Sequence, residues 1–215
     1  MNHCDVSLYA IIDPNRTQGR PLSEMVIAAA EGGITLLQYR DKLADTATLI
    51  ANARIIKSAL DPYNIPLLIN DRVDVALASG ADGVHVGQSD MAPTDARRLL
   101  GSEAIIGLTI KTEEHAISAP LDKIDYACIG GVYSTLSKDN PINIGLHGWR
   151  EIALHFRQRA PQLPVGAIAG IDGSNLADVM ENGADGAAII SAIFMADDVW
   201  VATRKLKAII QDHQS

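Results

Sequence analysis

Aromatic residues and cysteines are scarce in this chain of 215 residues. Phe, Trp and Tyr make up only 4% of it, whereas hydrophobic residues as a whole make up 47%. A core built mainly from Ala, Ile, Leu and Val favours buried parallel strands covered by helices over an antiparallel sandwich. The two cysteines, Cys4 and Cys128, lack the spacing of a disulfide framework or a zinc site. We interpret Cys128, which lies in an apolar run, as a buried structural thiol.

The chain also lacks an excess of positive charge and long apolar runs. Its formal net charge of −8 argues against nucleic acid or an anionic membrane as the main partner. Small anionic substrates stay open, because local basic groups decide their binding. No apolar stretch reaches the roughly 20 residues that a membrane span needs, and residues 1–5 show no signal peptide. We expect a cytoplasmic protein, for which a homo-oligomer is a possible assembly.

Short apolar runs alternate with Ala-rich helical patterns along the whole chain. Strands are predicted at residues 7–12, 36–39, 66–69, 83–86, 105–108, 126–129, 165–168 and 186–190. Helices are predicted at residues 22–31, 46–60, 73–79, 93–100, 113–119, 149–159, 175–181 and 199–211. Eight such units indicate an α/β fold, a closed (β/α)8 TIM barrel rather than an open sheet. We expect one domain over residues 1–215, with a barrel core at about 7–213.

A short sequence repeat supports repeated strand–helix units. The residues Gly-Ala-Asp-Gly at 80–83 recur at 183–186. The first glycine of each copy is suited to end a helix, since glycine takes a positive φ at little cost. We interpret this repeat as structural.

Two predicted strands end in carboxylates. Asn70 and Asp71 follow the strand at 66–69, and Asp90 lies shortly after the strand at 83–86. Neighbouring strands lie about 4.8 Å apart, so both carboxylates could hold one cation at the same rim. Such oxygens suit Mg²⁺, which takes its other ligands from water and substrate phosphates. Alternatively, each carboxylate only forms a turn or caps the following helix.

Basic and amide side chains follow the strand at 36–39. Alternation along the strand sends Gln38, Arg40 and Lys42 to one side. Arg supplies a bidentate fork for phosphate oxygens, and Lys supplies a compact positive charge. An ordinary solvated loop is the alternative for these residues. Their position beside Asp71 and Asp90 favours a phosphate site.

Further polar residues follow the fifth and sixth strands, and His85 lies within the fourth. Thr109 offers a hydroxyl at a strand end, whereas a hydrogen-bonded core histidine is the favoured interpretation of His85. The longest irregular stretch, residues 130–148, contains Thr135, Ser137 and Lys138. A loop of this length is often functional. These three residues could clamp an anion or belong to an ordinary polar loop.

The turns after the last two strands suggest a second anion site. Gly170 follows the seventh strand, and Ser191 follows the eighth. Loops at these places often bind phosphate in this fold. Glycine lets backbone N–H groups approach a phosphate, and a helix start supplies unpaired donors.

Taken in order, these motifs resemble the thiamine phosphate synthase (thiamine-phosphate pyrophosphorylase) family. The matching segments are QYRDK (38–42), INDR (69–72), GVHVGQSD (83–90), GLT (107–109), TLSK (135–138) and ISA (190–192). The resemblance implies a transferase that joins 4-amino-5-hydroxymethyl-2-methylpyrimidine diphosphate to a thiazole phosphate. The products would be thiamine phosphate and pyrophosphate. It further implies an Mg²⁺-dependent, dissociative substitution at the pyrimidine methylene, without a covalent nucleophile.

The resemblance also implies roles for individual residues. Asp71 and Asp90 would bind Mg²⁺, and Arg40, Lys42 and Lys138 would stabilise the diphosphate. The pyrimidine diphosphate would be held by Gln38, Arg40, Lys42, Asn70 and Thr109. The thiazole phosphate would be received by Thr135, Ser137, Gly170, Ile190 and Ser191.

Two positions depart from the pattern of the family. The loop has Ser134 and Ser137 where many relatives carry Pro-Thr-x-Thr, and Ser137 preserves the hydroxyl. Ala169 replaces the first glycine of a common Gly-Gly pair, so it must tolerate a backbone conformation that suits glycine.

Three other activities compete with this interpretation. A thiazole tautomerase, an isomerase on a similar barrel, would need an acid–base residue, and this chain has Lys111 where that relative has histidine. A Schiff-base lyase would use Lys42 or Lys138, but neither lies inside an apolar strand. A non-catalytic sensor of phosphorylated ligands would not need the complete metal set.

Overall fold

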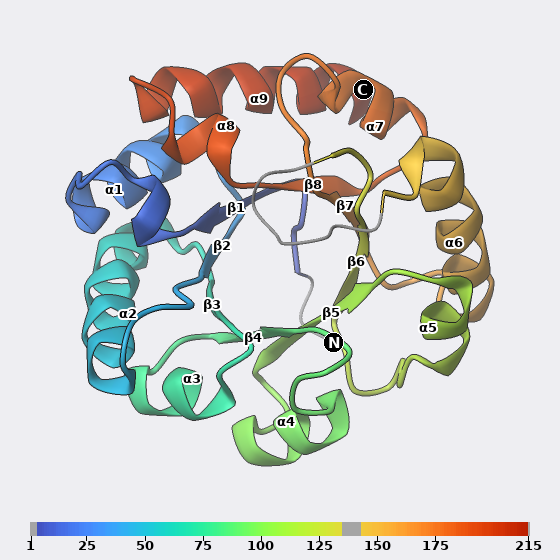
Figure 1. Ribbon diagram of the computed structural model, residues 1–215, viewed down its shortest axis with the longest axis horizontal. Coiled ribbons are helices and arrows are strands. Elements are labelled where there is room, and N and C mark those ends of the chain that lie inside the picture. The colour runs from blue at the N-terminus through green and yellow to red at the C-terminus, as the bar shows by residue number, and fades with distance from the viewer. Residues whose placement is uncertain (1–3, 135–142, 215) are drawn as a thin grey trace.

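Eight parallel strands close into a barrel in the computed structural model of the chain (Figure 1). The structure describes residues 4–134 and 143–214. The strands are β1 (Leu8–Ile12), β2 (Leu36–Tyr39), β3 (Leu67–Asn70), β4 (Gly83–Val86), β5 (Ile105–Ile110), β6 (Tyr126–Gly130), β7 (Val165–Ile168) and β8 (Gly186–Ile189). Each strand pairs with the next in the sequence, and β8 pairs with β1. The predicted (β/α)8 barrel is confirmed.

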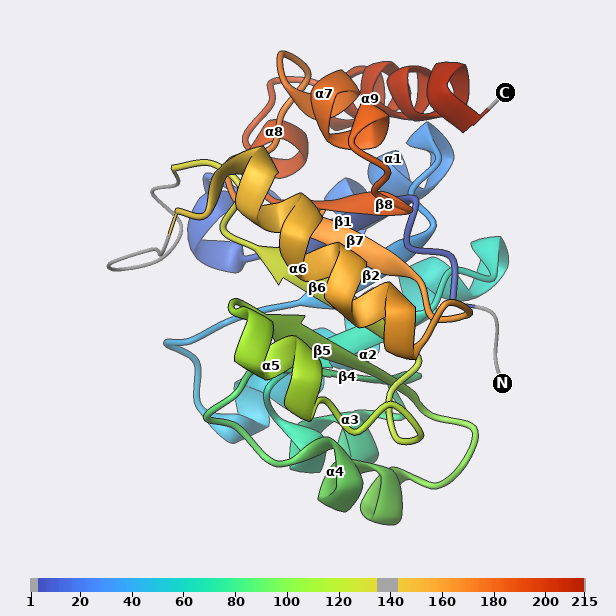
Figure 2. The ribbon, with the colours of Figure 1, turned by 90° about the vertical axis from the view of Figure 1, so that its right-hand side faces the viewer.

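Helices form a ring around the strands. They are α1 (Leu22–Gly32), α2 (Thr46–Leu60), α3 (Val73–Ser79), α4 (Pro93–Leu100), α5 (Glu113–Ser118), α6 (Gly145–Arg159), α7 (Leu176–Glu181), α8 (Ser191–Phe194) and α9 (Val199–Gln214). Two 3₁₀ turns, Pro14–Arg16 and Asp61–Tyr63, complete the described elements. The side view in Figure 2 shows α5 and α6 packed along the outside of the barrel.

The helix predictions are confirmed except at two places. Helix α6 begins at Gly145, before the predicted start at Trp149. Gly145 and Gly148 have low helix propensity, so the sequence does not predict this first turn. The short helix α8, four residues long, was not predicted because one turn has no hydrophobic period.

The strands are buried on both faces, which explains their continuous apolar sequences. One set of side chains packs between strands and helices, where Leu8, Ala10 and Ile12 of β1 lie. The alternate set, including Tyr9, Ile11 and Tyr126, fills the inside of the barrel. Cys128 belongs to this second set, which confirms the interpretation of a buried thiol.

Aspartates fix the start of three strands. Each carboxylate accepts a hydrogen bond from the backbone N–H of a neighbouring strand. These bonds join Leu67 to Asp82, Ile106 to Asp125 and Val165 to Asp185, each at 2.7 Å. A cation from the outer ring pairs with each aspartate. The cations are Lys57, Arg97 and Arg157, at 3.1, 2.6 and 2.9 Å.

The Gly-Ala-Asp-Gly repeat is therefore structural. Gly80 and Gly183 end their helices with φ of 77° and 89°. Asp82 and Asp185 supply the carboxylates just described. A Cβ at Gly83 would collide with the backbone carbonyl of Ile105 on the adjacent strand.

Gly107 leaves room for the side chains of Tyr126 and His85 inside the barrel. A larger residue at this position should therefore destabilise the fold. A Cβ at Gly107 would collide with the Tyr126 ring and stand 2.5 Å from His85 Nδ1. We expect Gly107→Ala to lower the free energy of unfolding by about 1–3 kcal/mol, the usual cost of overpacking. Urea unfolding measures the change. Gly173→Ala is the control, because its Cβ would meet nothing within 4 Å. Equal stability of the two variants would contradict this prediction.

Candidate active site

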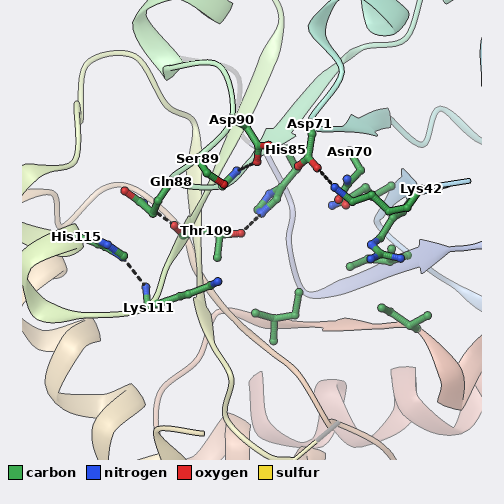
Figure 3. A pocket seen from close by; sticks show the side chains of 16 residues that line it. Lys42, Asn70, Asp71, His85, Gln88, Ser89, Asp90, Thr109, Lys111 and His115 are labelled. Atoms are coloured by element: carbon green, nitrogen blue, oxygen red, sulfur yellow. Dashed lines mark hydrogen bonds and ion pairs between the residues drawn. The ribbon is translucent and has the colours of Figure 1, made fainter. Parts of the chain in front are cut away.

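A cavity of about 540 Å³ opens at the rim formed by the carboxyl ends of the strands. Figure 3 shows the side chains around it. The lining residues are Ile11, Gln38, Arg40, Lys42, Asn70, Asp71, His85, Gly87, Gln88, Ser89, Asp90, Thr109, Lys111, His115, Ile168 and Ile190. The cavity brings together eight residues that the sequence analysis predicted for the metal site or for substrate binding. These are Gln38, Arg40, Lys42, Asn70, Asp71, Asp90, Thr109 and Ile190.

Asp71 turns into the cavity through an unusual backbone conformation. Its φ is 63°, in the left-handed region that only Gly, Asn and Asp enter with ease. Its backbone N–H donates to the carbonyl of His85 at 2.9 Å, which continues the β3–β4 pairing. The Arg72 N–H donates to the Asn70 carbonyl at 2.7 Å and closes the turn. The conformation is thus held by strand pairing on one side and by a tight turn on the other.

Asp90 is held by the loop after β4. Its Oδ2 accepts a hydrogen bond from the N–H of Gly87 at 2.8 Å. This bond folds residues 87–90 back so that the carboxylate stays at the rim. Asp90 does not cap α4, for which Ala92 is the N-cap residue. The alternative in which Asp90 only caps the following helix is wrong.

Burial and the neighbouring Asp90 carboxylate change the protonation of Asp71. Burial, together with a hydrogen-bonding and charge interaction with Asp90, raises the pKa of Asp71 above its usual value. The ammonium of Lys42, which forms an ion pair with Asp71 Oδ2, acts in the opposite direction but does not outweigh these effects. Two carboxylates this close favour the uptake of a proton or a cation between them.

Arg40 is held by a second ion pair on the neighbouring wall. Its Nη1 lies 2.7 Å from Asp13 Oδ2, and both side chains are largely buried. The Asp13 carboxylate is itself positioned, because Oδ1 accepts from the N–H of Asn15 at 3.0 Å. The guanidinium is therefore a fixed donor at the cavity, whereas Lys42 is more exposed.

A hydrogen-bonded network forms the floor of the cavity. His85 Nδ1 lies 2.8 Å from the Tyr126 hydroxyl, and His85 Nε2 lies 2.8 Å from Thr109 Oγ1. The Tyr126 hydroxyl donates to that of Tyr9 at 3.0 Å, and the Gln38 amide donates to the same Tyr9 oxygen. Burial raises the pKa of both tyrosines, so they stay neutral. The prediction of a hydrogen-bonded core histidine is confirmed.

Several residues that line the cavity had no role in the site predicted from the sequence. The amide of Gln88 donates to the Thr109 carbonyl at 2.7 Å and links β4 to β5. Lys111 and His115 line the far wall, and the Lys111 N–H donates to His115 Nδ1 at 3.4 Å. The signal for Lys111 was present in the alternation from Thr109, because residues two apart face the same side of a strand. Nothing in the sequence singles out His115.

The turns after β7 and β8 lie at the same rim. Ala169 has φ of 88° and Gly170 has φ of 66°, so the expected glycine-like conformation at Ala169 is confirmed. A Cβ at Gly170 would stand 2.5 Å from the Ser134 carbonyl oxygen. Ser191 begins α8. Gly170 and Ser191 do not line the cavity, whereas their neighbours Ile168 and Ile190 do.

The predicted loop residues Thr135, Ser137 and Lys138 lie outside the described residues. Their places in the site stay predictions.

Comparisons with known proteins decide the family. A family profile described as "Thiamine monophosphate synthase" matches residues 8–193. The chain belongs to the thiamine monophosphate synthase family. A thiamine-phosphate synthase of Agrobacterium fabrum is 49% identical over 211 residues, with 98% of this chain and 96% of the relative covered. One of Chloroflexus aurantiacus is 42% identical, with 96% and 93% covered. This member of the thiamine monophosphate synthase family is therefore an enzyme, as predicted.

A solved structure also resembles this member of the thiamine monophosphate synthase family. It is a thiamine phosphate pyrophosphorylase from Pyrococcus furiosus with a TM-score of 0.87 and 34% sequence identity. The comparison covers 99% of both chains. Within residues 4–134 and 143–214, no helix is both long and apolar enough to cross a membrane.

The rim of this family member fits a magnesium ion that has few protein ligands. No group of three or more His, Cys, Asp or Glu side chains gathers as a metal site among the described residues. Asp71 and Asp90 would then be the only carboxylate ligands from this part of the chain. Two carboxylates with water and phosphate oxygens completing the shell is a common arrangement for Mg²⁺.

The raised pKa of Asp71 predicts a pH-dependent stability. The folded protein holds the Asp71 proton more tightly than the unfolded chain does. The free energy of unfolding should therefore fall as the pH rises from the ordinary Asp pKa of 3.8 through the raised value. Asp71→Asn, which also tolerates φ of 63°, should remove this decrease and leave the variant at least as stable near neutral pH. Urea unfolding across pH, without added metal, measures it.

Asp74→Asn serves as the control for this prediction. The Arg72 guanidinium holds the pKa of Asp74 below its usual value, so ionisation of this carboxyl stabilises the fold as pH rises. The two substitutions should thus change the pH profile in opposite directions. A profile for Asp71→Asn that matches the wild type would contradict the assigned repulsion.

Proposed function

We propose that the protein joins 4-amino-5-hydroxymethyl-2-methylpyrimidine diphosphate to a thiazole phosphate and releases pyrophosphate. The product is thiamine phosphate, and the reaction depends on Mg²⁺. The observation that carries the proposal is the pair of carboxylates, Asp71 and Asp90, beside Arg40 and Lys42 in one cavity. Membership of the thiamine monophosphate synthase family supports the same reaction. Both substrates are small molecules, which suits a cavity of about 540 Å³.

The pyrimidine diphosphate occupies the side of the cavity between β2 and β5. Arg40 and Lys42 bind diphosphate oxygens, and Arg40 presents its guanidinium from a fixed ion pair with Asp13. Asn70, Thr109 and the buried Gln38 provide hydrogen bonds to the rest of this substrate. The Gln38 amide also contacts the neutral Tyr9 hydroxyl. Gln38 is thus oriented before substrate arrives.

Asp71 and Asp90 would hold Mg²⁺ at this rim. When bound, the ion neutralises negative charge on the diphosphate and makes it a better leaving group. The two aspartates are suited to this because the backbone of Asp71 has a fixed left-handed conformation and the Gly87 N–H contacts Asp90 Oδ2. Lys42 forms an ion pair with Asp71 at the same place and is the more exposed partner, so its ammonium is accessible to the diphosphate.

The chemical step breaks the bond between the pyrimidine methylene carbon and the diphosphate oxygen. The bonding electron pair leaves with the diphosphate, and the methylene carbon takes positive character that its electron-rich ring stabilises. The thiazole nitrogen then donates its lone pair to form the new C–N bond. No protein nucleophile or strong base is required. The protein contributes fixed positive charge and orientation, the latter worth about 7–11 kcal/mol in well-aligned reactions.

The thiazole phosphate occupies the side near β7 and β8. Gly170 and Ser191 stand at the ends of these strands, and Ile190 lines the cavity between them and the donor site. Thr135, Ser137 and Lys138 extend this site, with Lys138 contacting the diphosphate. Ala169 and Gly170 both have positive φ, a conformation that lets a backbone approach a ligand closely.

A Schiff-base lyase is less well supported than this transferase. An imine requires a lysine amine that is free to attack a carbonyl, whereas Lys42 is held in an ion pair with Asp71. The floor of the cavity offers the neutral hydroxyls of Tyr9 and Tyr126 and the hydrogen-bonded ring of His85, which suit binding an uncharged ring.

Activity should depend on both Mg²⁺ and Asp90. Purified protein with both substrates should form thiamine phosphate and pyrophosphate in equal amounts, and chelation of the metal should abolish both. Asp90→Asn keeps an oxygen for the Gly87 N–H but removes the negative charge, and we expect kcat to fall about 10²–10³-fold. Pyrophosphate release measures the rate.

The control is Asp95→Asn, which removes an exposed carboxylate paired with Arg98 outside the cavity. It should leave the rate and the melting temperature unchanged. Wild-type protein that forms no thiamine phosphate with Mg²⁺ would overturn the proposed reaction. Full activity of Asp90→Asn would overturn only the role of this carboxylate.

A further inference from the structure

Lys111 brings a positive charge to the wall of the cavity that lies away from Arg40 and Lys42. It follows β5 directly and lines the cavity with Thr109 and His115. In Figure 3 its side chain extends from this wall into the cavity, whereas Lys42 enters from the other side. The carboxylates of Asp71 and Asp90, which follow β3 and β4, lie between the two lysines along the rim.

The turn that carries Lys111 is held by a reciprocal cap. Thr112 Oγ1 accepts from the N–H of His115 at 3.2 Å and begins α5. His115 Nδ1 in turn accepts from the N–H of Lys111 at 3.4 Å. This resembles a capping box, in which the third helical residue reaches back to the start of the helix. The backbone of Lys111 is thereby fixed relative to β5.

The charge of Lys111 is not neutralised within the described part of the chain. Arg40 pairs with Asp13 and Lys42 pairs with Asp71, whereas no described carboxylate forms an ion pair with Lys111. Glu113, two residues away, instead lies 3.2 Å from His155 Nε2. A lysine directed into a cavity with its charge uncompensated is suited to bind an anionic ligand.

We infer that Lys111 binds a phosphate oxygen of a substrate, and that His115 is a positioning residue which fixes the Lys111 backbone. This inference rests on the proposed function, because it takes both substrates as phosphorylated. The ligand chemistry is a phosphate group, carried by the pyrimidine diphosphate or by the thiazole phosphate. Lys111 would then balance Lys42, so that positive charge flanks the carboxylate pair on both sides.

The first test measures binding to Lys111→Gln without catalysis. Calorimetric titrations use inorganic pyrophosphate with Mg²⁺ as the probe for the donor and inorganic phosphate as the probe for the acceptor. Loss of one charge-assisted contact should weaken one of the two by about tenfold or more. Weaker pyrophosphate binding assigns Lys111 to the donor, and weaker phosphate binding assigns it to the acceptor. Unchanged binding of both probes overturns the inference.

Kinetics with matched variants separate a charge role from a structural one. Lys111→Gln should raise KM for one substrate, and Lys111→Arg should restore part of the loss. Lys111→His should become more active as pH falls through about 6.5, where imidazole gains its proton. Lys123→Gln is the control, because Lys123 pairs with Asp122 outside the cavity. A pH profile of Lys111→His that matches the wild type overturns the charge role.

The positioning role of His115 needs its own comparison. His115→Ala should weaken binding of the same probe, whereas His115→Gln keeps a side-chain acceptor and should restore it. In a Lys111→Gln background, His115→Ala should have little further effect. Additive losses would contradict action through Lys111. If wild-type protein makes no thiamine phosphate, the proposed function fails. If it does and Lys111→Gln behaves as wild type, only this inference fails.

Discussion

The parallel direction of all eight strands is the constraint on which the rest of the structure depends. Because every strand ends at the same rim, side chains far apart in the sequence meet in one cavity. Gln38 on β2 and Ile190 after β8 both line it, although 152 positions separate them in the numbering. The opposite rim uses its charged side chains differently. There the aspartates before β4, β6 and β8 are used to hold strand ends.

The parallel strands also bring Asp71 and Asp90 together, although their proximity lowers the stability of the fold. Strand pairing fixes Asp71 through its bond to the His85 carbonyl, and the Gly87 N–H fixes Asp90. Burial and the neighbouring Asp90 carboxylate then raise the pKa of Asp71. Lys42 compensates part of this charge. An arrangement that is unfavourable for folding but favourable for holding a cation is typical of a functional site.

Much of the fold could be predicted from the sequence because buried parallel strands are continuous apolar runs. The strand at 83–86 is an example, since its Val-His-Val run lies between Gly83 and Gly87. The start of α6 and the one-turn α8 could not be predicted. Glycines with low helix propensity begin α6, and tertiary packing rather than a periodic pattern determines α8.

The site was predictable where charged residues stand at strand ends. Arg40, Asp71 and Asp90 are of this kind, and alternation from Gln38 correctly placed Arg40 and Lys42 in the cavity. The interior network was harder to foresee, because the hydroxyl of Tyr126 meets His85 only through barrel curvature and the space that Gly107 leaves. His115 accepts a hydrogen bond from the Lys111 N–H in a turn whose geometry the local sequence does not specify.

The central claim is that Asp71 and Asp90 together hold a cation for a diphosphate group. Calorimetric titration of Mg²⁺ into protein saturated with inorganic pyrophosphate tests it most directly, with the doubly substituted Asp71→Asn, Asp90→Asn protein as the comparison. The account predicts saturable binding to the wild type and affinity lower by about 100-fold or more in the double variant. Equal Mg²⁺ affinity of the two folded proteins would contradict it.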